Sequence, residues 1–390
     1  MSAVAEVSVQ PAPRKAGEGH FDWWLLGGAA GLLALGLLAM LSASSAVADA
    51  DYGNPLHFVT RQLVGVGMGV VAGTIVCFMP WRVLKSVVPL GYWGTIVLLV
   101  LVFTPLGHGA KGAHRWVDVG MINMQPSEYA KVALILMLAR FLHNNEGRLG
   151  DFMGVVLPAF GIAAPVLGLV LFEPDFGSTV LLAGITMLML FLAGMSLRWF
   201  GFLGLLGVPL MAGIALLEPY RVRRLVSFLD PFVDPEGSGY QVIQAWIALA
   251  TGGLWGNGLG TGVAQRGFLP EAHTDFISAV LGEELGAIGW IGMIGLFVLV
   301  IWRGAHIATR APDLFGNLAA MGATTLLGWQ AIINLGVVVG WLPAKGLVLP
   351  FMSYGASAIV VHVLCIGLLL RIGMEGQVVQ DAPATAGAKR

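Results

Sequence analysis

Charged residues and cysteines are scarce in this chain. Only 11% of its 390 residues are Asp, Glu, Lys or Arg, and the formal net charge is −1. This balance supplies no basic surface for a nucleic acid, so we expect no nucleic-acid partner. Both cysteines, Cys77 and Cys365, lie within apolar runs, which argues against a disulfide framework and against a thiolate metal site.

Long apolar segments take up most of the chain. Hydrophobic residues make up 57% of the sequence and the mean hydropathy is +0.82, well above the range of soluble domains. Ten segments approach the ~20 apolar residues that a helix needs to cross a bilayer. We therefore predict an all-α, polytopic membrane protein with ten transmembrane helices, at residues 23–42, 58–79, 87–104, 126–142, 152–172, 178–197, 200–217, 276–302, 314–339 and 352–371.

The basic residues of the short connections predict the orientation. Connections 81–85, 143–150, 196–199 and 302–310 carry Lys or Arg and fall on the side of the amino terminus, which the positive-inside rule places in the cytoplasm. Both termini are then cytoplasmic. The tails, residues 1–22 and 374–390, are polar with Pro, Ala and Gly, and we predict that they are disordered and flank a membrane domain at 23–373.

One long connection, residues 218–275, is expected on the outer side between the seventh and eighth helices. Its apolar stretch 240–254 is too short to cross a bilayer, so we predict an amphipathic helix in the interface or dipping into the bundle. The segment GNGLGTG (256–262) lacks the strand, the helix and the GKS or GKT of a nucleotide loop. It predicts instead a close approach of the backbone to another surface.

The segment PEAHTD (270–275) concentrates ionisable groups beside an apolar span. With Pro270 as the first helical residue, Glu271 and Asp275 lie four residues apart on one helical face. Two close carboxylates raise the proton affinity of one, which suits a general base. The alternative is a helix start with acidic residues favoured in its first turn.

The segment QPSEYAK (125–131) places a lysine inside the fourth predicted span. Ser127 is expected to cap the helix, and Glu128 and Lys131 share a face. A lysine in hydrocarbon needs a carboxylate partner. That partner is Glu128 alone in the simpler interpretation, whereas in the functional one Lys131 faces a cavity and tunes a second carboxylate such as Asp275.

Several arginines are expected on the outer side, where the positive-inside rule disfavours them. They suit bidentate binding of phosphate, and attraction to anionic lipid head groups is the alternative. The candidates are Arg115 in GAHRW and Arg221, Arg223 and Arg224 in RVRR.

Two polar, helix-breaking joints, EPDFGS (173–178) and PFMSYGAS (350–357), are expected at outer ends of spans. Membrane proteins tolerate such joints only where they are buried in protein or line a cavity. His108, His114 and His273 show no metal-ligand spacing, so zinc is not expected.

Five blocks of the chain together resemble the SEDS family of peptidoglycan glycan polymerases (FtsW, RodA and SpoVE). They run in the family's order from about residue 23 to 371, and PEAHTDF followed by GEELG resembles the division-type members more than the elongation-type ones. The sequence departs from the family pattern at SYGAS, where SYGGS is usual, and at Val348, where proline is more common. The blocks are GAHRWVDVGMINMQPSEYAK, EPDFGS, FLDPFVDPEGSGYQ, GNGLGTGVAQRGFLPEAHTDFISAVLGEELG and INLGVVVGWLPAKGLVLPFMSYGAS.

The resemblance implies an enzyme of the cytoplasmic (inner) membrane that joins lipid II units into β-1,4 glycan and releases undecaprenyl pyrophosphate. It implies Asp275 as the base and Lys131 as its ionic partner, with Glu128 and Glu271 tuning the cavity. Mg²⁺ or Mn²⁺ is an expected cation, and no nucleotide is. The expected substrate-binding residues are Arg115, Arg221, Arg223, Arg224, His273, Ser127 and Ser353.

The resemblance also implies partners. These are lipid II, the nascent glycan strand, membrane lipids, a class B penicillin-binding protein with a single span, and other division proteins. Three alternatives stay open: a lipid II flippase with no bond chemistry, an elongation-type polymerase, and a structural hub of the division apparatus.

Overall fold

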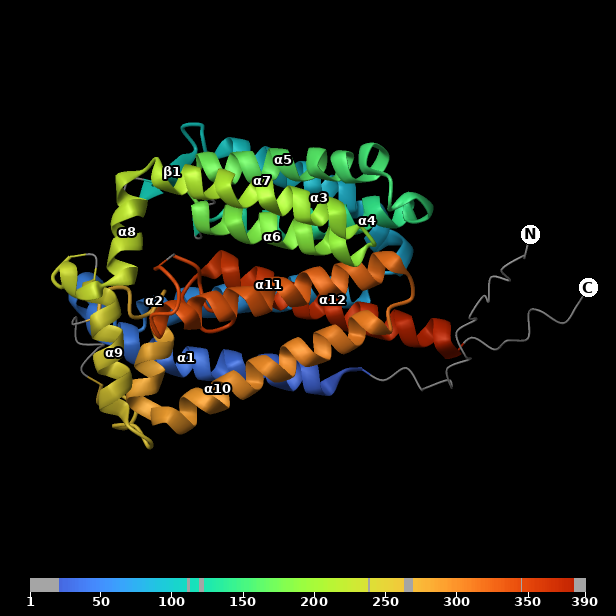
Figure 1. Ribbon diagram of the computed structural model, residues 1–390. Coiled ribbons are helices and arrows are strands. Elements are labelled where there is room, and N and C mark those ends of the chain that lie inside the picture. The colour runs from blue at the N-terminus through green and yellow to red at the C-terminus, as the bar shows by residue number, and fades with distance from the viewer. Residues whose placement is uncertain are drawn as a thin grey trace, which may run out of the picture.

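The structure is a computed structural model that describes residues 21–381, except 111–112, 119–122, 238, 263–268 and 345. The predicted disorder of residues 1–20 and 382–390 therefore falls outside the described residues. Long helices lie side by side and share one general direction (Figure 1). They are α1 (Trp23–Tyr52), α2 (His57–Phe78), α3 (Trp81–Leu101), α4 (Pro126–Asn144), α5 (Leu157–Phe172), α6 (Phe176–Leu192), α7 (Leu197–Leu216), α10 (Ile277–Thr309), α11 (Leu314–Val338) and α12 (Ala356–Asp381).

These helices form two groups. One contains α1, α2, α10, α11 and α12, and the other contains α3 to α7, with α11 packed against α4 and α6 where the groups meet (Figure 1). Each helix overlaps one of the predicted spans. Among the residues that the structure describes, eight helices are long and apolar enough to cross a membrane, so the all-α, polytopic prediction is confirmed. Helix α6 is shorter and α4 is not among the eight, so the count of ten spans stays a prediction.

The last helix differs from the prediction at its end. Helix α12 continues to Asp381, so the disordered tail predicted from residue 374 begins too early. Arg371 and Glu375, four residues apart, form an ion pair of 2.5 Å where the helix continues past residue 373.

The glycines of α2 bring two helices into backbone contact. Gly65, Gly69 and Gly73 are spaced by four residues on the face toward α12, and a Cβ at Gly73 would lie 3.0 Å from the Val363 carbonyl oxygen. A Cβ at Gly367 of α12 would lie 2.2 Å from the Gly73 carbonyl oxygen. Small residues at this spacing let membrane helices approach closely, which fixes α2 against α12.

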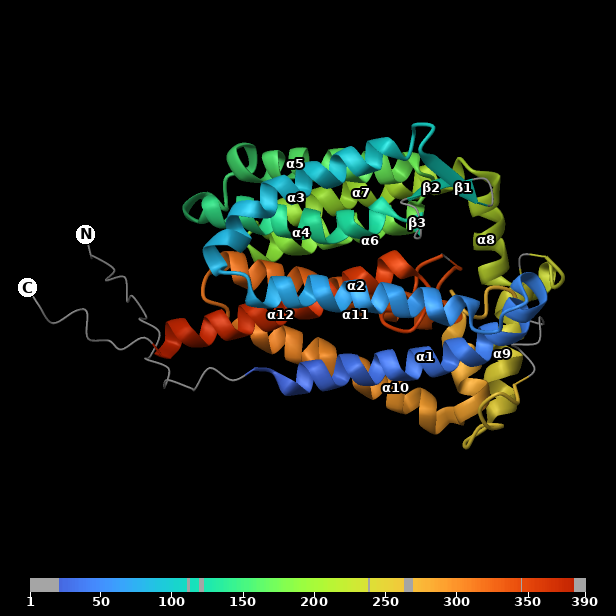
Figure 2. The same cartoon turned by 180° about the vertical axis from the view of Figure 1, so that it is seen from behind.

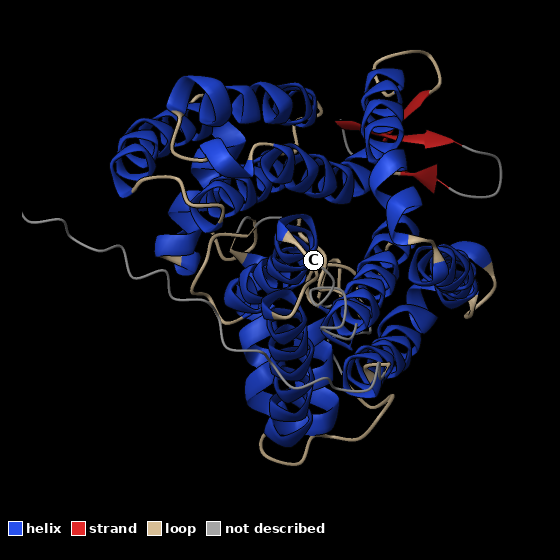
Figure 3. Ribbon diagram, turned by 90° about the vertical axis from the view of Figure 1, so that its right-hand side faces the viewer, coloured by secondary structure: helices blue, strands red, loops and turns tan. Residues whose placement is uncertain are grey.

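Ion pairs gather at the end of the bundle where α1 begins and α12 ends, called here the charged end and seen face-on in Figure 3. Arg303 pairs with the α1 cap residue Asp22 at 2.7 Å, and Lys85 pairs with the α11 cap residue Asp313 at 2.5 Å. Each aspartate also accepts a backbone N–H at the start of its helix, so capping and pairing reinforce one another.

The opposite end, called here the sheet end, carries irregular structure and short elements (Figure 2). The strands β1 (Gly107–Ala110), β2 (Ala113–Asp118) and β3 (Asn123–Met124) form an antiparallel sheet, which the sequence analysis did not predict. Helix α9 (Tyr240–Gly252) confirms the helix predicted at 240–254. A further, unpredicted helix α8 (Pro219–Leu229) stands across this end between the two helix groups (Figure 1).

Helix α10 is broken at Gly286, whose φ of 67° is left-handed. The segment from Gly253 through the GNGLGTG loop fills the break, because the Gly258 amide donates to the Glu284 carbonyl at 3.0 Å and the Ala287 amide donates to the Gly253 carbonyl at 2.9 Å. A Cβ at Gly256 would lie 2.1 Å from the Glu284 oxygen. The predicted close backbone approach is therefore confirmed, and it satisfies polar groups that a break in a membrane helix would expose.

Candidate functional site

Residues 270–276 form turns, and α10 begins only at Ile277. The predicted helix start at Pro270 is therefore wrong. Glu271 has a left-handed φ of 57°, so Glu271 and Asp275 do not share a helical face. Thr274 Oγ1 donates to Glu271 Oε2 at 2.9 Å, which holds the glutamate inside its own turn.

The turn is fixed by hydrogen bonds to distant segments. The Tyr354 amide donates to the His273 carbonyl at 2.9 Å. Asn334 of α11 donates through Nδ2 to the carbonyls of Asp275 and Leu347, both at 2.9 Å. These bonds take up carbonyls that a helix starting at residue 270 would use internally, which explains why the turn is not helical.

The Asp275 side chain is partly exposed at the sheet end, just before α10 enters the bundle. Its Oδ2 lies 3.6 Å from the position that a Cβ on Gly346 would occupy, so the loop between α11 and α12 (residues 339–355), called here the 340s loop, passes close beside the carboxylate. The ring of His273 lies 4.7 Å from that of Phe58 and 5.9 Å from that of Tyr354, measured between centroids. The turn formed by residues 273–275, called here the HTD turn, thus carries the Asp275 carboxylate together with a histidine ring that lies near the aromatic rings of Phe58 and Tyr354.

The PFMSYGAS joint is buried, as predicted for such joints. Gln62 of α2, which is fully buried, donates to the Ser353 carbonyl and accepts from the Gly355 amide, each at 3.1 Å. Ser353 Oγ accepts from the Leu349 amide at 2.8 Å. Ser353 is 4% exposed and therefore acts inside the loop, so the structure does not place it as a substrate-binding residue.

The buried lysine of α4 has a near partner. Lys131 Nζ lies 2.6 Å from Glu128 Oε1, and Lys131 is completely buried. Among the described residues the ion-pair partner of Lys131 is Glu128, one turn away in the same helix, as the simpler interpretation expects. The role of Lys131 toward Asp275 stays a prediction.

Ser127 does not cap α4. Gln125 occupies the cap position without a side-chain cap bond, and Pro126 is the first helical residue. Ser127 Oγ accepts from Gln125 Nε2 at 3.2 Å and is fully buried, which removes it from a direct role with substrate in this conformation.

The outer arginines divide into anchored and exposed side chains. Arg115 of β2 donates to the carbonyls of Glu173 and Pro174 at 3.0 and 2.7 Å, joining the sheet to the EPDFGS joint. Arg221 donates to the Ile214 carbonyl at 3.0 Å and packs over the Phe176 ring. Arg223, on the same helix α8, is exposed.

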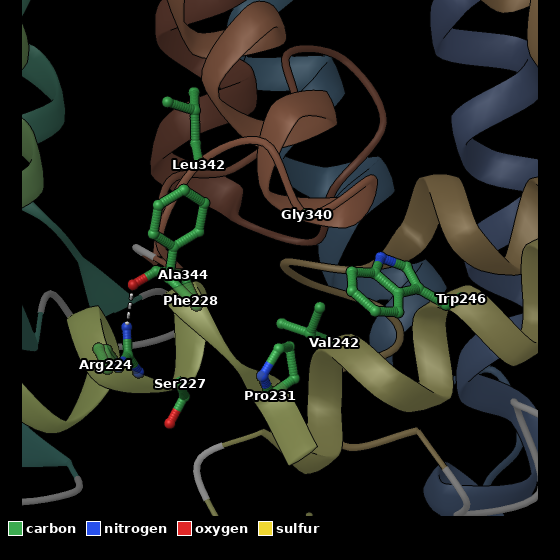
Figure 4. A pocket seen from close by; sticks show the side chains of 9 residues that line it. All are labelled: Arg224, Ser227, Phe228, Pro231, Val242, Trp246, Gly340, Leu342 and Ala344. Atoms are coloured by element: carbon green, nitrogen blue, oxygen red, sulfur yellow. Dashed lines mark hydrogen bonds between the residues drawn. The ribbon is translucent and has the colours of Figure 1, made fainter. Parts of the chain in front are cut away.

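Arg224 lines a small pocket between α8, α9 and the 340s loop (Figure 4). Its Nη1 donates to the Ala344 carbonyl at 2.9 Å, so α8 is tied to the loop that runs past Asp275. The remaining lining residues are mainly apolar: Ser227, Phe228, Pro231, Val242, Trp246, Gly340 and Leu342.

The EPDFGS joint holds a carboxyl group away from water. Glu173 is fully buried, and neither carboxyl oxygen has a hydrogen-bond partner. Burial, reinforced by the nearby Asp175 and opposed by Arg115, raises the pKa of Glu173 to about 8. Asp175 instead caps α6 by accepting from the Ser178 amide at 3.0 Å.

No group of three or more His, Cys, Asp or Glu side chains suited to a metal ion occurs in the part of the chain that the structure describes. The expectation of Mg²⁺ or Mn²⁺ stays a prediction.

The sequence of the whole domain matches one protein family. The Cell cycle protein family model FTSW_RODA_SPOVE matches residues 23–377. The chain belongs to this family. Stage V sporulation protein E of Bacillus subtilis (strain 168) is 39% identical over 345 residues, 87% of this chain and 93% of that protein. A probable peptidoglycan glycosyltransferase FtsW of Pseudomonas fluorescens (strain SBW25) is 41% identical over 375 residues, 94% of this chain and 91% of that protein.

Solved structures share the fold of this chain. A chain from a study of how a peptidoglycan synthase complex coordinates polymerization and crosslinking matches with a TM-score of 0.74 and 30% identity, covering 91% of this chain and 98% of that one. The rod shape determining protein RodA of Thermus thermophilus matches with a TM-score of 0.67 and 28% identity, covering 90% and 96%.

Sequence reasoning missed the buried amides that hold the site. Gln62 and Asn334 form hydrogen bonds with the loops around Asp275. Gln330, one turn before Asn334, contacts His362 Nε2 through Oε1 at 3.1 Å. The sequence feature that could have revealed them is a Gln or Asn inside an otherwise apolar span, because such a side chain needs a hydrogen-bond partner in a membrane.

Proposed function

We propose that this protein is a peptidoglycan glycosyltransferase that polymerises lipid II at the outer face of the cytoplasmic membrane during cell division. The observation that carries the proposal is the placement of Asp275. Asp275 is partly exposed at the sheet end, and its backbone carbonyl accepts a hydrogen bond from Asn334 of α11, which also donates to the Leu347 carbonyl. The chain is about 40% identical to a protein named for that activity.

In the proposed reaction the acceptor's 4-hydroxyl oxygen attacks the anomeric carbon of the donor sugar. The new carbon–oxygen bond forms as the bond to the carrier pyrophosphate breaks, and Asp275 takes the hydroxyl proton. The departing pyrophosphate carries the displaced electron pair. Arg223 is exposed on α8 and supplies a positive charge at the same end for that anion.

The charge distribution supports a topology with the charged end in the cytoplasm. Lys85, Arg148, Arg303 and Arg371 all lie there, as the positive-inside rule requires of the cytoplasmic side. The sheet end then faces outward, where lipid II sugars are available. A transpeptidase of the class B penicillin-binding type is the proposed partner.

Asp275→Asn tests the assignment. The purified variant in proteoliposomes should stay folded and monodisperse but form no glycan from labelled lipid II, because the amide accepts no proton. Wild-type polymerisation by Asp275→Asn would end the assignment of the base. Transfer of labelled lipid II between leaflets without any glycan from the wild-type protein would indicate a flippase instead.

A further inference from the structure

The side chain of Asn334 connects the two segments that flank Asp275. Its Nδ2 has two hydrogens, and the two acceptors are the carbonyls of Asp275 and Leu347, 59 and 13 residues away along the chain. Asn334 is 2% exposed. Both donors of the amide are therefore used on backbone, and neither faces solvent.

The two segments also lie close together beside the carboxylate. The Gly346 backbone passes beside the Asp275 carboxylate, with Oδ2 3.6 Å from where a Cβ would lie. Glu271 has a left-handed φ of 57°, so the turn departs from ordinary backbone geometry and needs external support. The Asn334 amide supplies that support from α11, a largely buried helix.

We infer that Asn334 is a positioning residue that sets the orientation of the Asp275 carboxylate by clamping the HTD turn to the 340s loop. This inference rests on the proposed function. Asn334 touches no reacting atom, so its removal should lower kcat while leaving the KM for lipid II nearly unchanged. A displacement of about 1 Å at a reacting group lowers a rate by roughly 100-fold.

Asn334→Leu removes both donors at similar volume. We expect kcat to fall ~10–100-fold with KM changed by less than about threefold, a ratio below that of one lost hydrogen bond to substrate. The control is Thr324→Val on the same helix, which removes a buried hydroxyl that has no hydrogen-bond partner. Wild-type kcat in Asn334→Leu, or a rise in KM alone, would overturn the inference.

Asn334→Asp keeps the shape and makes the clamp depend on pH. A buried carboxyl donates one hydrogen bond when protonated and none when ionised. The kcat of this variant relative to wild type should therefore rise as the pH is lowered from 8 to 6. A ratio that stays constant across this range contradicts a donor role, even where Asn334→Leu fails to fold.

A labelling experiment separates the clamp from the reaction. The native thiols Cys77 and Cys365 are buried, so a thiol introduced by Asp275→Cys is the reactive one among the described residues. Its maleimide labelling rate should increase severalfold when Asn334→Leu is added and stay unchanged with Thr324→Val. An unchanged rate with Asn334→Leu refutes the clamp, whereas loss of the proposed function shows only in the polymerisation assay.

Discussion

Lys131 and Glu128 form an ion pair of 2.6 Å one helical turn apart on α4, and both residues are buried. Glu128 Oε2 has no hydrogen-bond partner, so the lysine is the main compensation for this negative charge. The pair lies inside the helix bundle, where an uncompensated charge is strongly unfavourable.

Removing either charge alone should destabilise the protein. Lys131→Met leaves a buried carboxylate and Glu128→Gln leaves a buried ammonium, and breaking such a pair costs roughly 3–5 kcal/mol. The double variant should melt at a higher temperature than either single variant, as measured by thermal unfolding in detergent. Additive destabilisation would contradict the pairing. If the double variant regains stability relative to the single variants but still does not polymerise lipid II, the pair has a role in the reaction beyond stability.

The break in α10 gives a prediction with a matched control. Gly286→Ala places a Cβ 2.4 Å from the Gly256 amide at a φ of 67°. The strain alone is ~1–3 kcal/mol, and the contact adds to it. Gly292→Ala on the same helix meets nothing within 4 Å and should leave stability nearly unchanged. Equal melting temperatures for the two variants would show that the loop does not pack into the break.

Stability should depend on pH through Glu173. Its pKa is about 8 in the folded protein, above the ordinary 4.5, so the folded state binds a proton that the unfolded state releases. The stabilisation is complete below pH ~4.5 and is lost as the pH rises toward 8. Relative to Glu173→Gln, which cannot ionise, the wild-type melting temperature should fall between pH 5 and 8. A constant difference would exclude this titration.

The exposed Arg223 of α8 gives a prediction about substrate binding. Arg223 is exposed, so Arg223→Gln should raise the KM for lipid II by about 2–5-fold, the effect of one exposed charge contact, without lowering the melting temperature. The increase should shrink at high salt. Arg198→Gln removes an exposed arginine at the start of α7 and is the control. A larger increase in KM from Arg198→Gln than from Arg223→Gln would show that α8 does not contribute to substrate binding.

Much of the fold was predictable because a membrane helix is recognisable from a short stretch of sequence. A run of apolar residues must be helical in hydrocarbon, whatever its neighbours are, since only a helix satisfies its own backbone there. The helix predicted at 240–254 followed from the same reasoning. The sheet at 107–124 was missed, because short strands with His, Gly and Arg carry little alternation of apolar and polar residues.

The chemistry of single residues was less predictable than the segments that contain them. Asp275 was located correctly at the sheet end of α10, but its turn was taken for a helix. This error arose because Pro270 and two acidic residues are typical of a helix start. The partner of Lys131 was left open between Glu128 and Asp275, because a sequence shows that a buried lysine needs a carboxylate but not which one is nearest.

The sequence by itself determined that the chain is all-α and polytopic, where its long apolar helices lie and which family it resembles. Those properties depend on neighbours within a few residues. Only the tertiary structure decided how the HTD turn is held, because Gln62 reaches across 291 residues to Ser353 and Asn334 across 59 to Asp275. Hydrogen bonds over such separations leave no periodic pattern in a sequence, so the arrangement of the site emerges only when the helices pack.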